Sequence, residues 1–292
     1  MRQPRIGRSR ATLIGMIAIF LWSMLAVLTV GTAPMPPLQL NAICFGLATV
    51  IGAAWLLFSD SWSGLLGVSW TVYVFGTAGL FGYHLLYFTA LRLAPAADAG
   101  LIAYLWPLLI VIFSGLLPGE RLKLGHIIGA FLGLMGAALI ILQNGAEFES
   151  EFALGFGFAF LCALTWSGYS VVSRRLGNVP TSTVVVFCAL TSVLSFGVPL
   201  LVETPVWALS PVGWGAVIAL GVGPVGIAFF AWDVGVKYGD IQILGVASYA
   251  APLLSTLLLV VVGIAALTPG LLVAAILITA GAAVAARSSQ II

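Results

Sequence analysis

The chain repeats itself, and the repeated unit is almost entirely apolar. Trp22-Ser23 recurs as Trp166-Ser167, and further along each unit the matching residues stand 145 positions apart. These later matches are Gly76 with Gly221, Gly100 with Gly245, Tyr104 with Tyr249, Pro107-Leu108-Leu109 with Pro252-Leu253-Leu254, and Gly125 with Gly270. The sequence therefore uses one unit of about 145 residues twice.

Composition places the repeat in a membrane. Apolar residues make up 62% of the chain and charged residues 7%, with a mean hydropathy of +1.19, whereas a soluble domain carries about 25% charged residues. Each helix that spans a bilayer needs about 20 apolar residues. The apolar runs are continuous and do not alternate with polar residues, which favours helices over a β-barrel. We therefore expect an all-α, polytopic membrane protein.

Apolar stretches between proline, glycine and charge clusters predict ten spans, five in each repeat. They lie near 11–31, 37–58, 68–91, 96–117, 124–143, 152–173, 181–202, 211–234, 240–262 and 266–286. We place the first repeat in 1–146 and the second in 147–292. Because five is odd, the second copy must insert upside down, and inverted repeats are typical of transporters that open alternately to the two sides.

The basic residues indicate how the spans are oriented. If the N-terminus is cytoplasmic, ten of the eleven Lys and Arg residues fall on the cytoplasmic side and only Arg92 falls outside. The acidic cluster Glu147, Glu149 and Glu151 falls outside as well. This distribution follows the positive-inside rule. We therefore expect a multi-pass protein with both termini in the cytoplasm.

Two patterns of glycine residues stand out, one along span five and one within span eight. Gly125, Gly129, Gly133 and Gly136 recur along span five, and small residues at this spacing let two helices approach closely in lipid. We expect spans five and ten to pack mainly on each other within a monomer. The segment 221–226 matches the G-x-G-x-x-G pattern of nucleotide-binding loops, but it lies within span eight and no β-strand precedes it. We interpret it as a helix loosened by glycine and proline.

The symmetric prolines indicate where a ligand binds. Pro107 in span four and Pro252 in span nine are expected to bend their helices and free backbone carbonyls. Tyr104 precedes Pro107 by three residues, and Tyr249, with Ser248 before it, precedes Pro252 by three residues as well. A purely structural kink is the alternative. The repeated phenol beside each proline favours a binding site.

An aromatic face in span three is the second candidate. His84 lies well inside the span, between Tyr83 and Tyr87, and ionisable groups at this depth tend to face a cavity. The alternative is a histidine that bonds only to a backbone carbonyl. Four further aromatic residues could face inward or belong to an interfacial belt: Trp22, Trp106, Trp166 and Tyr169.

The remaining charged residues lie at span ends, where we expect them to be solvated or paired with one another: Arg92, Asp98, Asp233, Lys237 and Asp240. We identify no catalytic residues, metal ligands or cofactor site. No basic cluster at membrane depth could hold a phosphate, and we expect no nucleic-acid partner.

Two five-span units, each with Trp-Ser in the first helix and Gly-x-x-x-Tyr-x-x-Pro-Leu-Leu in the fourth, resemble the EamA-type drug/metabolite transporter superfamily. The Tyr/His-rich third span and Trp106 beside Pro107 look most like its YddG-type exporters of aromatic amino acids. The resemblance covers nearly the whole chain. It implies a central cavity between the two halves that binds substrate, and export from the cytoplasm across a bacterial inner membrane.

We therefore expect a secondary transporter, not an enzyme, that exports aromatic and other neutral amino acids through a central cavity by facilitated diffusion. The substrate would be held by Trp22, Tyr83, His84, Tyr87, Tyr104, Trp106, Pro107, Trp166, Tyr169, Ser248, Tyr249 and Pro252. Two alternatives stay open: proton-coupled export of other small metabolites or drugs, and an intramembrane enzyme that modifies lipid.

Overall fold

The structure is a computed structural model that describes residues 6–59, 62–142, 148–197 and 204–290. Within these residues it contains helices and no strand. Nine helices in the described part are long and apolar enough to cross a membrane, and Thr183–Gly197 is a shorter apolar helix. Together they give the ten spans that the sequence predicts, five in each repeat. The predicted boundary between residues 146 and 147 lies outside the described residues.

The first repeat breaks its first and fourth spans into two helices. In order, its elements are α1 (Arg8–Ser23), α2 (Leu25–Gly31), α3 (Pro37–Ser59), the short α4 (Ser63–Leu66), α5 (Trp70–Leu93), α6 (Ala96–Ala103), α7 (Trp106–Ser114) and α8 (Leu124–Ile141).

The second repeat breaks its third and fourth spans. A 3₁₀ turn (Ser150–Phe152) leads into α9 (Ala153–Arg175), which is followed by α10 (Thr183–Gly197), α12 (Pro211–Val222), the π-helical turn η2 (Gly223–Ile227), α13 (Ala228–Tyr238), α14 (Ile241–Ala247), α15 (Ala250–Val261) and α16 (Pro269–Gln290).

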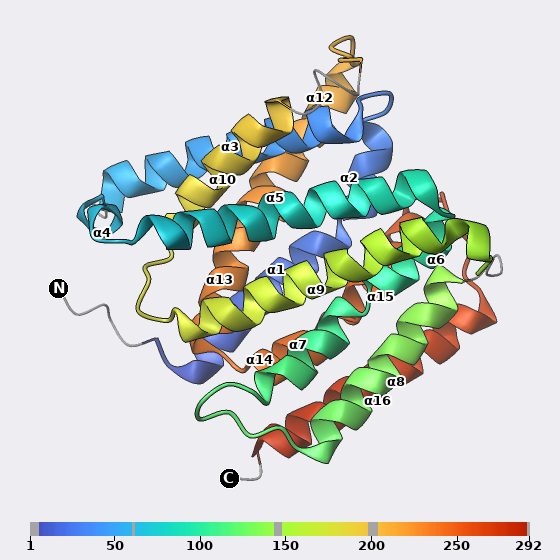
Figure 1. Ribbon diagram of the computed structural model, residues 1–292. Coiled ribbons are helices and arrows are strands. Elements are labelled where there is room, and N and C mark those ends of the chain that lie inside the picture. Colours follow the sequence, from blue (N-terminus) through green and yellow to red (C-terminus); the bar gives the residue numbers. More distant parts are fainter. Residues whose placement is uncertain (1–5, 60–61, 143–147, 198–203, 291–292) are drawn as a thin grey trace.

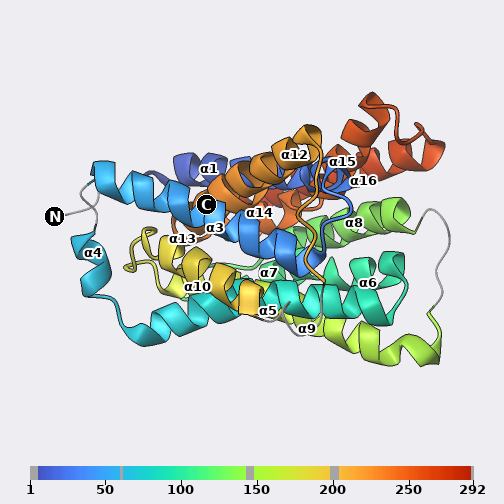
Figure 2. The same ribbon diagram turned by 90° about the horizontal axis from the view of Figure 1, so that it is seen from above.

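The helices of the two repeats pair around an approximate two-fold axis. The first span of each repeat packs against the third span of the other, so that α1 contacts α13 and α9 contacts α5. Spans of the same rank also meet, with α3 on α10, α7 on α14 and α8 on α16. In both views α8 and α16 lie at one side of the bundle, and α3 and α10 lie at the other (Figure 1 and Figure 2).

One set of contacts shows that the repeats are inverted. Arg8 at the start of α1 and Arg174 at the end of α9 both bond to Glu120. The first helices of the two repeats therefore cross the molecule in opposite directions.

The glycines of α8 bring it into close contact with α16, as the sequence predicts. A Cβ atom on Gly129 would lie 2.5 Å from the carbonyl oxygen of Gly281, and one on Gly136 would lie 2.9 Å from that of Ala274. Such distances exclude any larger side chain at these positions. In lipid, where apolar burial drives no association, close backbone approach of this kind holds helices together.

The segment 221–226 loosens its helix, which confirms the sequence interpretation. Pro224 has no N–H group, and the chain passes through the π turn η2 before α13 begins. The indole Nε1–H of Trp22 donates to the carbonyl oxygen of Pro224 at 3.1 Å, so a side chain of the other repeat satisfies this carbonyl.

The prediction that the prolines of the fourth spans bend continuous helices is wrong, because each proline lies at the start of a separate helix. α6 ends at Ala103 and α7 begins at Trp106, which places Pro107 in the first turn of a new helix. Pro252 likewise lies in the first turn of α15. Proline is tolerated in a first helical turn because its missing N–H would have no partner there. Each fourth span is therefore two short helices joined near the middle of the span.

Of the charged residues at the span ends, Arg92 is exposed, as expected of a solvated residue, whereas the others are buried: Asp98, Asp233, Lys237 and Asp240. Lys237 Nζ donates to Asp233 Oδ2 at 2.8 Å, and both side chains are at most 3% exposed. Thr181 Oγ1 donates to the same carboxylate oxygen at 2.7 Å. Asp240 pairs with Arg8 at 3.1 Å, and Asp98 is buried near the start of α6.

Candidate functional site

A cavity of about 100 Å³ lies between the two repeats. Its lining from the first repeat is Trp22, Leu25, Tyr83, His84, Tyr104 and Trp106, and its lining from the second is Trp166, Pro224, Val225, Phe229 and Ala251. The lining residues come from α1, α2, α5, α7, α9, η2, α13 and α15, with Tyr104 at the break between α6 and α7. Both broken fourth spans and the π turn therefore contribute to the cavity.

Three tryptophans line the cavity, and a fourth, Trp232, is fully buried and packs against them. Trp22 lies in the middle, with its ring centroid 6.2 Å from that of Trp106, 5.7 Å from that of Trp166 and 5.0 Å from that of Trp232. Trp166 and Trp232 are stacked, with 23° between their planes. Since aromatic pairs in such geometries gain about 0.5–1.5 kcal/mol beyond their burial, the cluster forms a rigid aromatic surface.

The four indoles differ in what their N–H groups do. Trp22 donates to Pro224, and Trp232 donates to Ser170 Oγ at 3.0 Å. No described residue accepts from Nε1 of Trp106 or of Trp166. Two indoles are thus anchored in the protein, while two keep a donor for a ligand.

Span three supplies the polar part of the lining. His84 Nδ1 lies 2.7 Å from the carbonyl oxygen of Leu80. A carbonyl only accepts, so Nδ1 carries the proton, and in the neutral ring Nε2 is an acceptor. The ring of His84 therefore bonds to a backbone carbonyl and also lines the cavity. The hydroxyls of Tyr83 and Tyr104 have no partner among the described residues.

Two further predicted residues lie behind the lining. Tyr87 stacks on Tyr83 with 3° between the planes, and Tyr169 stacks on Trp166 at 5.2 Å. Both support rings that reach the cavity without lining it themselves.

Four predicted site residues lie elsewhere, and for these the expectation of a cavity-lining position does not hold. Pro107, Ser248 and Pro252 are buried outside the lining. Tyr249 is fully buried, and its hydroxyl accepts from the backbone N–H of Leu108 at 3.1 Å. That N–H belongs to the first turn of α7, where the helix itself supplies no acceptor.

The apolar side of the cavity was not predicted from the sequence. Phe45 stacks on Phe229 at 5.4 Å and meets His84 edge-on at 5.2 Å, so it connects the two walls. The positions of Pro224 and Val225 could have been predicted, because a helix loosened by glycine and proline is tolerated where it lines a cavity. For Leu25, Phe229 and Ala251 the sequence shows only that they are apolar, which does not distinguish a cavity lining from a core.

The lining can recognise a flat, neutral or zwitterionic molecule. Apart from His84, none of the lining residues titrates near neutral pH, and the aromatic rings present π-faces and edges. Among the described residues no three His, Cys, Asp or Glu side chains lie close enough to hold a metal ion. The arrangement therefore suits binding through ring contacts and a few hydrogen bonds.

Comparison with known proteins agrees with this architecture. The chain is 52% identical over 284 residues to the aromatic amino acid exporter YddG of Ancylobacter novellus, covering 96% of this chain and 98% of the relative. It is 26% identical over 263 residues to the aromatic amino acid exporter YddG of Escherichia coli, covering 86% and 88%. A crystal structure of a protein with 51% identity superimposes with a TM-score of 0.93, covering 97% of this chain and all of the other.

The family model adds the repeat. The description "EamA-like transporter family" matches residues 9–142 and again residues 153–287. The two matches coincide with the two five-span halves of the structure. The chain is thus a member of the EamA-like transporter family.

Proposed function

We propose that the protein exports aromatic amino acids, together with other neutral amino acids of similar shape, through the cavity between its repeats. The observation that carries the proposal is an aromatic lining with several unbonded donors and acceptors at the centre of an inverted repeat. Two relatives that match most of the chain are named as exporters of aromatic amino acids. Substrate would be bound by Trp22, Tyr83, His84, Tyr104, Trp106 and Trp166.

The aromatic surface suits the side chain of such a substrate. An indole or phenyl ring has an edge and a face, and the tryptophans around Trp22 present both, with planes that range from stacked to nearly perpendicular. Pairs of this kind favour an aromatic ligand over an aliphatic one of equal area.

The unbonded polar groups suit the zwitterionic head. The Nε1–H groups of Trp106 and Trp166 would donate to the carboxylate, whereas Nε2 of neutral His84 would accept from the ammonium group. Because the site offers single hydrogen bonds and no opposite charge, it would release substrate readily. A transporter needs binding that is weak enough to allow exit.

We place the end of the bundle that holds Arg8, Glu120, Arg174 and Asp240 in the cytoplasm of a bacterial cell and the protein in its inner membrane. The excess of Lys and Arg at this end supports that orientation. The cavity is complete within one chain, so we propose that a monomer transports.

Transport would follow the substrate gradient without a coupled proton. A coupled carrier needs a deep group that changes its charge in each cycle. Asp233 is buried, but Lys237 and Thr181 already hold its carboxylate. Only His84 remains in the cavity as a titrating group, and one imidazole is a weak coupling device.

Counterflow of radiolabelled phenylalanine and tryptophan in proteoliposomes tests the proposal. Vesicles clamped at equal internal and external pH should exchange both amino acids. Replacement of Trp166 by Ala should lower the rate at least about tenfold, because both the ring contacts and the free N–H disappear. Trp214→Ala, at a half-buried position of α12 outside the cavity lining, is the matched control.

Two outcomes would contradict the proposal. If the Trp166→Ala variant exchanged substrate as fast as the unchanged protein, the cavity would not be part of the transport path. Uphill accumulation that follows an imposed pH gradient and disappears in His84→Ala, with binding intact, would replace facilitated diffusion by proton coupling at His84.

A further inference from the structure

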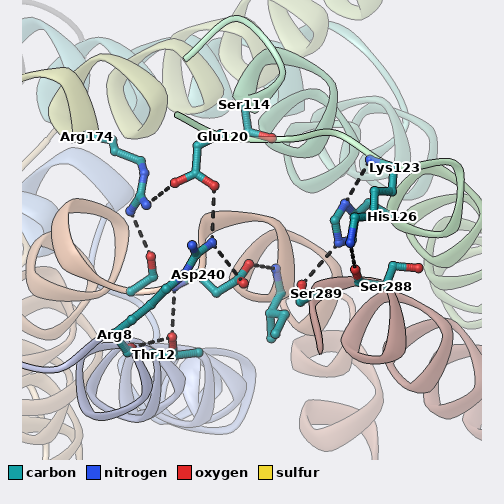
Figure 3. Close-up of polar contacts among 12 residues, drawn as sticks. Arg8, Thr12, Ser114, Glu120, Lys123, His126, Arg174, Asp240, Ser288 and Ser289 are labelled. Carbon is teal, nitrogen blue, oxygen red and sulfur yellow. Dashed lines mark hydrogen bonds and ion pairs between the residues drawn. The ribbon is translucent and has the colours of Figure 1, made fainter. Parts of the chain in front are cut away.

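Four charged side chains form one connected network at the end of the bundle where α1 begins (Figure 3). Glu120, in the loop between α7 and α8, accepts from Arg8 Nη2 at 3.2 Å through Oε2 and from Arg174 Nη2 through Oε1. Arg8 also donates to Asp240 Oδ2 at 3.1 Å. The side chain of Glu120 is only 7% exposed. We call Arg8, Glu120, Arg174 and Asp240 the four-charge network.

The two members from the second repeat are fixed to helix ends. Asp240 caps α14, accepting from the N–H of Ile243 at 3.0 Å. Arg174 Nη1 donates at 2.8 Å to the carbonyl oxygens of Val236 and Gly239, where α13 ends. A cation is stabilised at this negative end of a helix. The network therefore connects whole helices.

The network also joins the two repeats. Arg8 and Glu120 belong to the first, whereas Arg174 and Asp240 belong to the second. If the cavity opens towards this end by separating α1 and the loop before α8 from the ends of α9 and α13, the Glu120–Arg174 and Arg8–Asp240 contacts must break together.

The positions that the repeat makes equivalent to the four-charge network lie at the opposite end and are uncharged. The Trp-Ser match sets an offset of 144 for the first span, so Arg8 corresponds to Phe152 and Arg174 to Val30. The later spans match at an offset of 145, so Glu120 corresponds to Ala265 and Asp240 to Pro95. None of these four residues carries a charge. The repeat therefore does not reproduce the four-charge network at its equivalent positions.

We propose that the four-charge network is a latch that closes the cytoplasmic end and makes this closed conformation the resting state. The proposal rests on the proposed transport function and orientation. Alternating access needs two conformations of similar free energy, and ionic contacts on one side bias that balance. An ionic latch is also easily reversed, because charges released into water are rehydrated, which offsets much of the lost attraction.

Cysteine accessibility tests the latch without using a substrate. Ser114, at the end of α7 near Glu120, is fully buried, so Ser114→Cys reports opening at this end. Leu25 lines the cavity and lies farther from Arg8 along the first span, so Leu25→Cys reports the other side. The purified full-length chain in lipid nanodiscs is alkylated with a water-soluble maleimide, and the rate is measured for each reporter.

Glu120→Gln should raise the alkylation rate of Ser114→Cys at least about fivefold and lower that of Leu25→Cys, as expected for a shifted equilibrium between two conformations. Arg8→Gln should act in the same direction more weakly, because Glu120 keeps Arg174. Arg10→Gln removes a charge from an exposed residue of the same helix outside the network, and it should leave both rates unchanged.

A second measurement separates opening from loss of structure. Raising the salt concentration should increase the Ser114→Cys rate in the otherwise unchanged protein but not in Glu120→Gln, since the screened contacts are already lost there. An unchanged Ser114→Cys rate in Glu120→Gln would overturn the latch. The latch would also be overturned if Glu120→Gln raised the alkylation rate at both reporters and at the buried native Cys44, Cys162 and Cys188, with no salt effect. Such a general rise would show that the variant unfolds. Failure of transport with a working latch would refute only the transport proposal.

Discussion

Tyr104 and Tyr249 hold the same place in the fourth spans of the two repeats, but only Tyr104 reaches the cavity. Tyr104 stands at the break between α6 and α7 and lines the cavity with a hydroxyl that no described residue bonds. Tyr249 stands at the break between α14 and α15, is fully buried, and accepts from the Leu108 N–H. One tyrosine is available to a ligand, while its counterpart holds together the break that positions the site.

The fifth spans explain this difference. Tyr249 packs over Gly133 of α8, where a Cβ atom would lie 2.4 Å from the tyrosine ring. At the offset of 145, the residue of α16 that corresponds to Gly133 is Ile278. Ile278 is itself buried against α8, so α16 offers no equivalent recess for Tyr104. A single small-to-large difference between the repeats thus divides two equivalent tyrosines into a ligand-facing and a supporting residue.

The largest expected effect comes from filling that recess. Gly133→Ala should lower the free energy of unfolding by about 1–3 kcal/mol, because the new methyl group overpacks the Tyr249 ring between two closely packed helices. Thermal unfolding of the purified protein in detergent measures the effect. Gly168→Ala is the matched control, since a Cβ atom there meets nothing within 4 Å. Equal stability of the two variants would show that the ring moves freely and that Gly133 does not direct it.

Much of the fold could be predicted from the sequence because its signals are local or repeated. Hydropathy and the positions of Lys and Arg predict the spans, and the glycines of α8 predict its close contact with α16. The repeat predicts the inverted pairing of helices. None of these inferences requires knowing which way a side chain turns.

The site was predictable only in part for the same reason. Of the twelve predicted residues, six line the cavity in this structure, while Tyr249 and Pro252, predicted from their symmetry with Tyr104 and Pro107, lie outside the lining. Trp232 was missed, although it stacks on Trp166, because its counterpart at the offset of 145 is Tyr87 and the repeat gives no match. The difference between Gly133 and Ile278 was visible in the sequence, but its meaning required knowing that Tyr249 lies against α8.

A smaller effect is expected from removing only the hydroxyl of the supporting tyrosine. Tyr249→Phe leaves the N–H of Leu108 without an acceptor, which should cost about 1 kcal/mol of stability. The cavity keeps all of its lining residues, so the dissociation constant for tryptophan, measured by isothermal titration calorimetry, should stay the same. A changed affinity at unchanged stability would contradict the division of roles between the two tyrosines.

The smallest expected effect comes from removing the hydroxyl of the cavity-lining tyrosine. Tyr104→Phe removes a hydroxyl that has no partner among the described residues, so unfolding should occur at the same temperature as in the unchanged protein. If that hydroxyl bonds to the zwitterionic head, affinity for tryptophan should fall about fivefold, the value of one hydrogen bond of about 1 kcal/mol.

Together, Tyr104→Phe and Tyr249→Phe delete the same atom at symmetric positions, so the comparison cancels the intrinsic cost of the change. Affinity should respond to one variant and stability to the other. If both variants lost affinity equally, the two spans would act symmetrically on the ligand during the cycle, and the buried position of Tyr249 would belong to only one of its conformations.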